Sequence, residues 1–405
     1  MAPVSLTQVA LESAPQTAER LVPPRPPAPP APLKPLRYFP TFVRNPLRSV
    51  PESVYHDPYL VPHTLNGRVA WVTEPSLVEK ILLTTVEAFN KTPLERRILK
   101  PALGTGILTA EGQDWKWQRR TTAPLFQHKE LTRHLPAMND ASQALIANWR
   151  ETSSHAIRRV DRDMTDVTFD VLRRTIFPGL SEASTQSIKS DGDRYLNLSS
   201  WELAFGMIGA SENLWHPAKA LMRRAAGRQR ALILDLVKRE RAQGWPAGGI
   251  LAKLGQATDP ETAAPMDDEQ IVDNLLTFAA AGHETTAKAL QWALYLMARS
   301  PAWQARVRDE VRSVLGDGPV TQDNLDKLDI TRRVLKESMR LYPPAPVMTR
   351  LARDGFDLGG ATLRPGAIVV IPIFAMHRHS KLWTDPHAFD PDRFTLEREK
   401  THART

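Results

Sequence analysis

The sequence has no cysteine among its 405 residues. Disulfide bonds and thiolate metal sites are therefore excluded within this chain, because both need cysteine side chains. A zinc site of the His-Glu-x-x-His type is excluded as well. His283 and Glu284 begin that pattern, but its fifth position is Ala287. Neither the thiolate sites nor this zinc motif can hold a metal here.

Long hydrophobic runs are also absent. A bilayer-spanning helix needs about 20 consecutive apolar residues, and the run Ala367–Met376 is too short and is typical of a strand. The N-terminus lacks the apolar centre of a signal peptide. We therefore expect a cytoplasmic protein with no membrane segment.

The formal net charge is +8, yet the sequence contains no nucleic-acid-binding motif and no block rich in Lys and Arg. Nucleic acid is therefore not expected as a partner. Two interpretations of the charge stay open, a basic patch that docks an acidic protein and a solvated basic surface without a single partner. Hydrophobic residues make up 42% of the chain, which is enough for one large domain or two smaller ones.

Hydrophobic periodicity predicts a mainly α protein with a small β part. Residues 1–36 are expected to form a Pro-rich disordered tail, because this segment is too rich in proline to build a core. The remaining predicted elements are a strand at 67–73, a helix from 74 to about 85, a mostly helical stretch from about 112 to 241, a loop at 246–266, helices at 301–315 and 331–341, and a hairpin of 356–363 with 367–373.

The most informative segment is a helix predicted over residues 267–300. Asp267 and Gln270 are spaced as in a capping box, and Pro301 is a stop signal. At about 1.5 Å per residue the helix would be roughly 50 Å long and would cross a whole domain. It is apolar on most sides, which is typical of a buried helix. Charge in its middle is therefore costly unless the protein uses it.

That middle reads Ala281-Gly282-His283-Glu284-Thr285-Thr286. Ala281 and Thr285 are four residues apart and share a helix face, and Gly282 leaves room beside them. The Thr285 hydroxyl can donate to the Ala281 carbonyl and bend the helix there. Two interpretations stay open. The segment is either a notch that holds a small molecule and relays protons to it, or a glycine kink with satisfied polar groups.

Two further patterns combine charge with helical spacing. Glu337 and Arg340 lie three residues apart on one helix face, and Arg393, in Pro-Asp-Arg-Phe, can close a network with them. A surface pair of this kind contributes only about 0.2–0.5 kcal/mol and is common. Trp115 and Arg119 also share a helix face. They form either an anion clamp or a solvated basic face with one buried Trp.

Together, and in this order, these segments resemble the cytochrome P450 superfamily of haem-thiolate monooxygenases. The matching segments are the Trp-x-x-x-Arg helix, Ala-Gly-His-Glu-Thr-Thr, Glu-x-x-Arg and Pro-Asp-Arg-Phe. The resemblance covers roughly residues 38–394. It implies a cytochrome P450 domain at 37–405, mainly α with a small β region, without the cysteine loop and the helix that follows it in the family.

The resemblance also implies roles for residues of this chain. Trp115, Arg119, Arg350 and His377 would contact the propionates of haem b, an iron cofactor held without a covalent bond. Ala281 and Gly282 would lie over the haem where oxygen binds, and Glu284 and Thr285 would deliver protons during oxygen activation. The triad of Glu337, Arg340 and Arg393 would hold the haem cradle.

The implied activity is hydroxylation of an apolar small molecule with dioxygen. The sequence has no flavin or iron–sulfur motif, so electrons would come from a separate ferredoxin or flavodoxin with an NAD(P)H reductase. The protein itself is expected to be a monomer. Substrate contacts are expected in residues 89–108, 198–215, 278–283 and 345–349, with Trp201, Phe205 and Trp215 prominent.

The family's iron ligand is a cysteine thiolate in a loop soon after Pro-x-Arg-Phe, and this chain has no cysteine. A thiolate ligand favours O–O cleavage. Three interpretations stay open. The chain is a truncated reading of an active enzyme, or a non-catalytic, haem-free remnant or small-molecule binder, or a haem protein with another ligand such as His377, His379 or His402.

Overall fold

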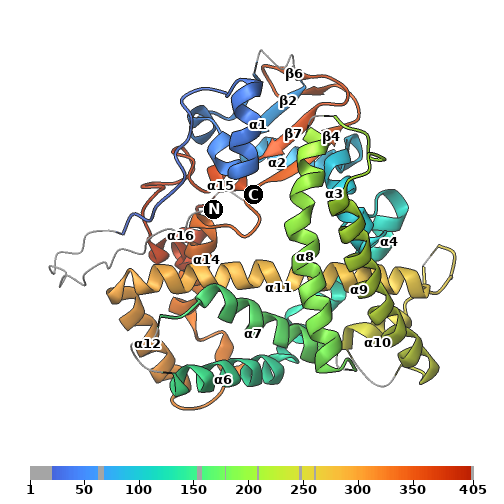
Figure 1. Ribbon diagram of the computed structural model, residues 1–405. Helices are drawn as coiled ribbons and strands as arrows, with labels where there is room; N and C mark the ends of the chain where they lie inside the picture. The colour runs from blue at the N-terminus through green and yellow to red at the C-terminus, as the bar shows by residue number, and fades with distance from the viewer. Residues whose placement is uncertain are drawn as a thin grey trace.

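The computed structural model describes residues 21–62, 68–152, 157–177, 179–207, 209–245, 249–259 and 261–402. A small sheet lies at one end of the molecule, and long helices occupy the rest (Figure 1). This agrees with the mainly α fold predicted from the sequence. The helices are α1 (Pro35–Arg44), α2 (Pro75–Glu79), α3 (Pro93–Leu103), α4 (Gly112–Thr122), α5 (His128–Thr132), α6 (Leu135–Glu151), α7 (Val160–Thr175), α8 (Glu182–Met207), α9 (Pro217–Ala242), α10 (Gly249–Gly255), α11 (Asp268–Ala298), α12 (Pro301–Leu315), α13 (Gln322–Leu325), α14 (Asp329–Leu341), α15 (Ile373–Met376) and α16 (Leu396–Glu399).

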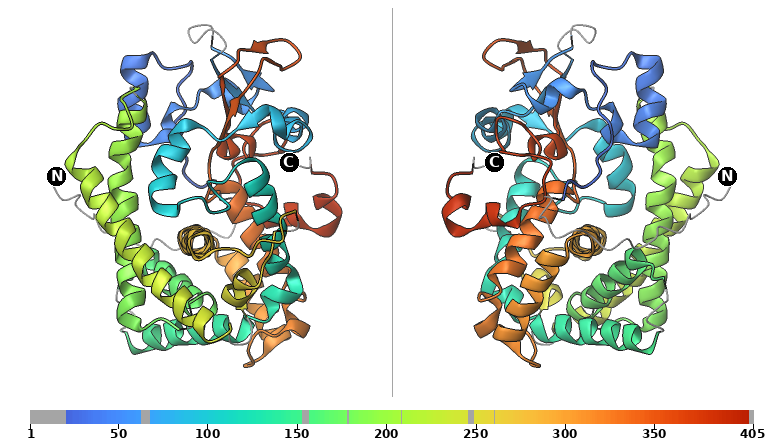
Figure 2. Two further views of the ribbon diagram at one scale, coloured as in Figure 1. Left: turned by 90° about the vertical axis from the view of Figure 1, so that its right-hand side faces the viewer. Right: turned by 90° about the vertical axis from the view of Figure 1, so that its left-hand side faces the viewer.

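The central helix α11 is the element predicted at 267–300. Its capping box is present, since the Asp267 carboxylate accepts from the Gln270 backbone N–H at 2.8 Å and the Gln270 side chain accepts from the Asp267 N–H at 3.1 Å. The helix crosses the molecule and packs on α7, α9 and α14. Figure 2 shows it end-on near the centre, with other helices around it. Residues on this helix are therefore placed inside the fold.

The main sheet has the order β1-β2-β7-β4-β3. β2 and β7 pair in parallel, with Val69 opposite Ile368, and the neighbouring pairs are antiparallel. β5 and β6 form a separate two-stranded sheet. The strands are β1 (Tyr59–Leu60), β2 (Val69–Val72), β3 (Phe89–Asn90), β4 (Met348–Ala352), β5 (Phe356–Asp357), β6 (Thr362–Leu363) and β7 (Ile368–Ile371).

The predicted hairpin of 356–363 with 367–373 is wrong. Its first half folds on itself as β5 and β6, and its second half, β7, pairs with β4 and β2. β7 has buried residues on alternate positions, Val369 and Ile371, and it gains two long partners in the middle of the sheet. Pairing with β5 or β6 would have given β7 a partner strand of only two residues. The pairing of β7 was therefore set by its position in the main sheet and not by the local turn signals, which had predicted a hairpin.

The predicted loop at 246–266 also needs correction, because residues 249–255 form helix α10. Ile250, Leu251 and Leu254 of this helix are buried in the largest hydrophobic cluster. Its formation follows from tertiary burial, which overrides weak local propensity in short segments. The helices predicted at 301–315 and 331–341 are confirmed as α12 and α14. The helix predicted from residue 74 begins as α2 and continues as a π-helical turn to Thr84.

Residues 21–34 of the Pro-rich segment have no regular secondary structure, and helix α1 begins at Pro35, while residues 1–20 of the expected tail lie outside the described residues. The described part nevertheless contacts the folded domain. The Phe389 N–H donates to the Leu21 carbonyl at 2.8 Å, and the Tyr342 hydroxyl donates to the Pro24 carbonyl at 2.8 Å. Residues 21–34 thus lie along the surface near α14. Among the described helices, none is long and apolar enough to cross a membrane.

Candidate active site

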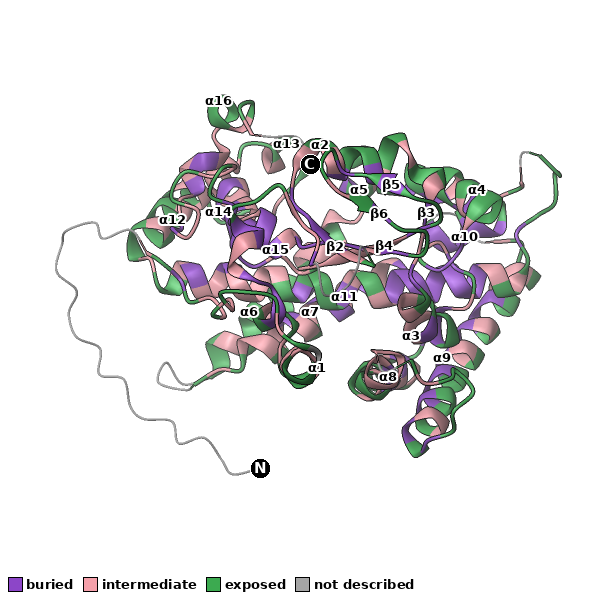
Figure 3. Ribbon diagram, turned by 90° about the horizontal axis from the view of Figure 1, so that it is seen from above, coloured by how far each residue is buried: buried purple, intermediate pink, exposed green. Residues whose placement is uncertain are grey.

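One face in the middle of α11 is not covered by any described part of the chain. Ala281, Glu284 and Thr285 are exposed, and their spacing places them on one side of the helix. The preceding turns of the same helix are buried, with Leu275 0% exposed, whereas the following turn is mixed, with Ala287 2% exposed and Lys288 exposed. Figure 3 shows this change from buried to exposed along the helix. A polar face at the centre of the fold is therefore open to a ligand.

The other side of the same turn packs tightly on α7. A Cβ added to Gly282 would lie 3.1 Å from Leu172 Cδ2, so a larger residue there would need the Leu172 side chain to shift by a few tenths of an ångström. His283 is buried and its carbonyl accepts from Thr168 Oγ1 at 3.0 Å. The His283 ring also meets the Phe169 ring edge-on at 5.4 Å. These contacts fix the rotation of α11 that turns Ala281 and Thr285 outward.

The expected hydrogen bond within this turn is present. Thr285 Oγ1 donates to the Ala281 carbonyl at 2.5 Å. The hydroxyl therefore already donates its hydrogen bond, and its oxygen can still accept a hydrogen bond from a neighbouring group. The Glu284 carboxylate beside it is exposed. A hydroxyl and a carboxylate thus stand at the edge of the open face.

The predicted triad of Glu337, Arg340 and Arg393 is assembled and buried. Their exposed fractions are 0%, 2% and 3%. The Glu337 carboxylate accepts two hydrogen bonds from Arg340, from Nε at 2.7 Å and from Nη2 at 2.8 Å. Arg393 Nε lies 3.4 Å from Glu337 Oε1. The Asp390 N–H also donates to Glu337 at 2.8 Å, so one carboxylate joins α14 to the segment after α15.

The two arginines extend this network to backbone carbonyls. Arg340 Nη1 donates to the carbonyls of His377 at 2.6 Å and Pro386 at 2.8 Å. Arg393 Nη2 donates to the Asp385 carbonyl at 2.7 Å. A loop with little regular structure is thus ordered by side chains from a helix. Burial lowers the pKa of Arg393 and the facing Glu337 carboxylate acts to raise it.

Trp115 and Arg119 lie on α4, where the predicted spacing places them on one face. Trp115 is half-buried and Arg119 is exposed, and within the described part of the chain neither side chain has a hydrogen-bond or ion-pair partner. Trp117, two residues away, carries the buried indole. The loop between α3 and α4 links helix α4 to α11. Gln118 of α4 donates to the Thr105 carbonyl at 2.9 Å, and the Thr105 N–H donates to Asp273 of α11 at 2.6 Å.

Lys91 is a further basic residue near these groups, and no sequence pattern predicted it. It follows β3, whose pairing with β4 continues towards Arg350, and its Nζ donates to the Ala110 carbonyl at 2.6 Å. Burial lowers the pKa of Lys91 to about 8, with Glu111 acting to raise it and Arg350 to lower it. Two cations therefore stand near the start of α4. No local motif marks Lys91, since only the sheet register brings it to this corner.

His377 follows α15 and is largely buried. Burial and then the charge of Arg340 lower the pKa of His377 to about 4, so the ring is neutral at neutral pH. Its Nδ1 atom is buried and has no hydrogen-bond partner within the described residues. A buried polar atom without a partner is costly. This position therefore suits a ligand group with a matching polar atom.

The histidines proposed as alternative iron ligands differ in their surroundings. Both ring nitrogens of His379 are engaged, Nε2 with the Asp57 carbonyl at 3.2 Å and Nδ1 with the Lys381 N–H at 3.3 Å. His402 packs its ring against Trp383 at 4.9 Å. Across the described ranges, no group of three or more His, Cys, Asp or Glu residues could hold a metal ion. His379 is therefore the least available of the three.

The aromatic residues expected to contact substrate cluster near the end of α8. Trp201 and Phe205 are neighbours at 6.2 Å between ring centroids, and both lie against His216. Trp201 is 55% and Trp215 70% exposed. Their assignment to substrate binding stays a prediction.

Comparison with known proteins gives concordant results. The model of the family described as Cytochrome P450 matches residues 56–404. "Cyclooctat-9-en-7-ol 5-monooxygenase" from Streptomyces melanosporofaciens is 29% identical over 364 residues, covering 88% of this chain and 77% of that protein. "Cyclooctatin synthase" from the same organism is 31% identical, covering 80% and 70%. A solved structure, the cytochrome P450DA heme domain, superposes with a TM-score of 0.71 at 28% identity, covering 83% of this chain and 73% of that one.

Proposed function

The chain belongs to the cytochrome P450 family of monooxygenases, and we propose that it binds haem b and hydroxylates an apolar small molecule with dioxygen. The observation that carries this proposal is the open face of Ala281, Glu284 and Thr285, which directly follows the buried N-terminal half of the central helix. A flat apolar cofactor against that face would bury it. The polar groups at its edge would then be placed beside the reacting substrate.

The residues assigned to the propionates carry groups that suit the anionic edge of a haem. Trp115, Arg119 and Arg350 provide N–H donors, and the orphaned Nδ1 of His377 would gain a partner from a propionate or from a water bound to it. Arginine suits carboxylates because its donors form a planar fork. Haem, when bound, supplies the redox-active iron that activates dioxygen. Neutral His377 adds a polar contact without adding charge.

Glu284 and Thr285 would manage protons at this face. Thr285 Oγ1, held by the Ala281 carbonyl, would accept a proton from solvent-facing groups and pass one on towards the substrate side. Glu284, being exposed, can exchange protons with water. The triad of Glu337, Arg340 and Arg393 would act at a distance, by ordering the loop that carries His377.

Partners and substrate are inferred from the residue types and the relatives. Electrons would arrive from an acidic ferredoxin or flavodoxin served by an NAD(P)H reductase, which suits a chain with net charge +8. One relative is named as a monooxygenase of cyclooctat-9-en-7-ol, which supports an apolar substrate. A monomeric state and a cytoplasmic location stay predictions.

A second candidate follows from one observation, the absence of cysteine from all 405 residues. The thiolate that the family uses is not among them, and His379 is occupied by protein partners. Without a thiolate ligand, the chain would be a haem-free remnant or a non-catalytic binder of small molecules. This alternative uses the same open face without oxygen chemistry.

The two candidates are separated by supplying haem to the purified chain and measuring the haem retained after gel filtration. Retention near one haem per chain, lowered severalfold by Trp115→Phe and by Arg119→Gln, is expected if these residues hold the propionates. Arg120→Gln is the matched control, because Arg120 lies on the same helix but pairs with Glu261 at 3.7 Å. No retention favours the haem-free alternative, whereas full retention that ignores all three changes contradicts the assignment of Trp115 and Arg119 to the propionates.

A reduced carbon-monoxide difference spectrum of the same sample reports the iron ligand. No residue of this chain can supply a thiolate, so we expect no Soret band at the red-shifted position typical of thiolate ligation. Such a band would show that sulfur reaches the iron from outside these residues.

A further inference from the structure

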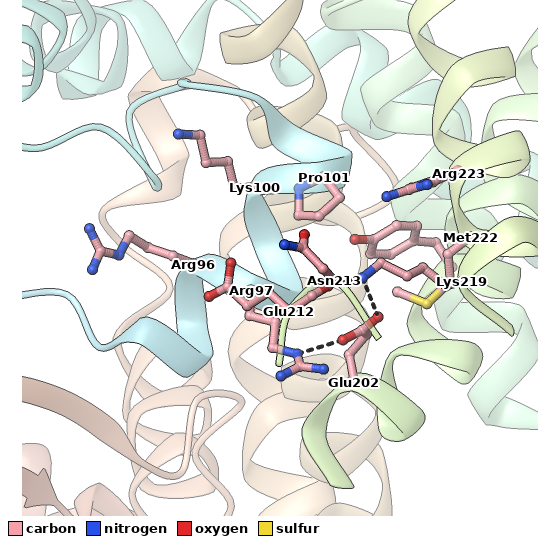
Figure 4. Close-up of a pocket in the computed structure, with 11 residues that line it drawn as sticks. Arg96, Arg97, Lys100, Pro101, Glu202, Glu212, Asn213, Lys219, Met222 and Arg223 are labelled. Carbon is pink, nitrogen blue, oxygen red and sulfur yellow. Dashed lines mark hydrogen bonds and ion pairs between the residues drawn. The ribbon is translucent and has the colours of Figure 1, made fainter. Parts of the chain in front are cut away.

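Arg378 is a buried arginine without a carboxylate partner. Its exposed fraction is 2%, and no ion pair joins it to any described residue. The other buried arginines of the described ranges are all paired: Arg97 with Glu202, Arg333 with Asp392, and both Arg340 and Arg393 with Glu337. Figure 4 shows one such neutralised group, where Glu202 is joined to Arg97 and Lys219. Arg378 is therefore the exception among the buried arginines.

Aromatic rings stack on the Arg378 guanidinium but leave its donors free. Its central carbon lies 3.8 Å from the centre of the Phe374 ring and 5.6 Å from that of Tyr342. Stacking uses the flat face of a guanidinium, whereas the N–H donors point outward in its plane. Nη1 reaches only the Phe374 carbonyl at 3.5 Å, and Nη2 is buried without a hydrogen-bond partner in the described part of the chain. Burial lowers the pKa of Arg378 to about 9, so the group is still charged at neutral pH.

The Pro-rich segment brings a second arginine, Arg25, to the same place. The Tyr342 ring that meets Arg378 also donates from its hydroxyl to the carbonyl of Pro24, at 2.8 Å. The residue that follows Pro24 is Arg25, whose charge is among those that act on the pKa of Arg378. The docking of residues 21–34 on the domain therefore places two guanidinium groups close together.

Arg25 is only partly neutralised. Its Nη2 lies 3.6 Å from Glu52 Oε1, and the same carboxylate oxygen lies 3.4 Å from His56 Nε2. The Glu52 side chain is 40% exposed, so water weakens this pair. The Arg25 guanidinium also lies 5.2 Å from the centre of the Tyr55 ring. Its Nη1 is buried and, among the residues that the structure describes, has no hydrogen-bond partner.

A third nitrogen of the same kind belongs to His387. Its Nδ1 is buried and has no hydrogen-bond partner within the described ranges. Burial, followed by the charges of Arg25 and Arg378, lowers the pKa of His387, so the ring is neutral at neutral pH. A neutral imidazole can donate from Nδ1 in one of its tautomers.

These three nitrogens share a need that an anion meets. A buried cation without a partner is costly, and a buried donor without an acceptor adds to that cost. An anion accepts hydrogen bonds from several donors, and those from charged donors are the strongest. Because all three nitrogens are covered by protein atoms, the anion must be small.

We propose that a small monovalent inorganic anion, of the size of chloride, binds between Arg378, Arg25 and His387. The anion would neutralise the unpaired arginine and join the Pro-rich segment to the region after α15. The site uses none of the residues assigned to haem or to proton delivery, so this inference goes beyond the proposed function.

The test compares thermal unfolding of the purified 405-residue chain in chloride and in gluconate, which is too bulky for the site, at one ionic strength. With chloride at about a hundred times its dissociation constant, Tm is expected to be about 3 °C higher than in gluconate. Bromide should replace chloride. The NMR linewidth of chloride should broaden in the presence of the chain and narrow again when bromide is added. Equal Tm values in chloride and gluconate, or a linewidth that bromide leaves unchanged, would overturn the proposal.

Matched variants locate the anion. Arg378→Gln and Arg25→Gln are each expected to reduce the chloride-dependent rise in Tm severalfold. This difference between two salts is insensitive to any change in packing that a substitution causes in both. Arg37→Gln, exposed on α1, is the control and should keep the full rise. Arg25 lies in a segment without regular structure, so its variant tests the site even if Arg378→Gln does not fold. A full rise in Arg25→Gln would mean a general salt effect and refute the site.

Haem supplies the competing anion, because a propionate is also a small acceptor. Adding haem to the same sample should leave the chloride-dependent rise unchanged. Loss of the rise on adding haem would assign Arg378 to a propionate and overturn the inorganic site. The chloride response of the haem-free chain does not depend on whether haem is retained, so the failure of either proposal is visible without the other.

Discussion

Replacing Glu337 by glutamine tests whether the buried triad holds the fold together. The carboxylate is fully buried and accepts three hydrogen bonds, two from Arg340 and one from the Asp390 N–H. Glutamine keeps the shape but removes the negative charge. Arg340 would then be a buried cation without its ion-pair partner, and Arg393 would keep only the weaker influence of Asp390.

The size of the effect follows from burial. Breaking a buried ion pair by removing one partner costs about 3–5 kcal/mol. With an unfolding entropy of about 2.1 cal/mol/K per residue, a chain of this length would lose about 4–6 °C in Tm. The loss should be accompanied by a more exposed loop after α15, because Arg340 also holds the carbonyls of His377 and Pro386.

Thermal unfolding followed by circular dichroism measures this shift, and limited proteolysis reports the loop. The matched control is Asp235→Asn, which removes the carboxylate of an exposed ion pair with Arg239, also within one helix. An exposed pair of this type contributes less than about 1 kcal/mol. The control should therefore move Tm by about 1 °C or less.

If Glu337→Gln and Asp235→Asn shift Tm equally, the reasoning about the triad is refuted. The same conclusion follows if the loop is cleaved no faster in Glu337→Gln than in the unchanged chain. The network would then be present without stabilising the fold.

Two further predictions concern stability. Folding lowers the pKa of His377 from 6.5 to about 4. Between those pH values only the unfolded chain binds this proton, so the free energy of unfolding falls by about 3 kcal/mol as the pH drops from 6.5 to about 4. In Tm measurements from pH 7.5 to 4, His377→Gln should flatten that fall, and parallel curves would contradict the prediction. Gly106→Ala should destabilise by about 1–3 kcal/mol, because its Cβ would lie 2.5 Å from the Asp273 carbonyl oxygen and Thr277 Oγ1. Gly227→Ala, with open space in helix α9, should stabilise by about 0.5–1 kcal/mol in the same denaturant titration, and equal effects of the two changes would refute the packing argument.

The long helix and its functional turn could be predicted because their signals are local. A capping box, an apolar run and a stop proline define α11 within one segment, and the structure begins and ends it within two residues of the prediction. The hydrogen bond from Thr285 to Ala281 follows from helix geometry alone. The spacing of Glu337 and Arg340 likewise requires only that α14 is a helix.

Other features depended on partners distant in the chain. β7 joined β4 and β2 and left the predicted hairpin, because a strand gains more from two neighbours in a buried sheet than from one short partner. Helix α10 formed in a segment of loop-like composition because its apolar residues reach the main hydrophobic cluster. Lys91 carries no sequence signal, since only the pairing of β3 with β4 brings it near Arg350.

The sequence by itself determined the helical class, the central helix with its polar turn, and the residue types that point to haem and oxygen chemistry. It also determined that no cysteine is available, whatever the fold. Only the tertiary structure decided which face of α11 is open and that one carboxylate would face two buried arginines. Local patterns are set by interactions within a few residues, whereas burial and charge pairing depend on packing across the whole chain.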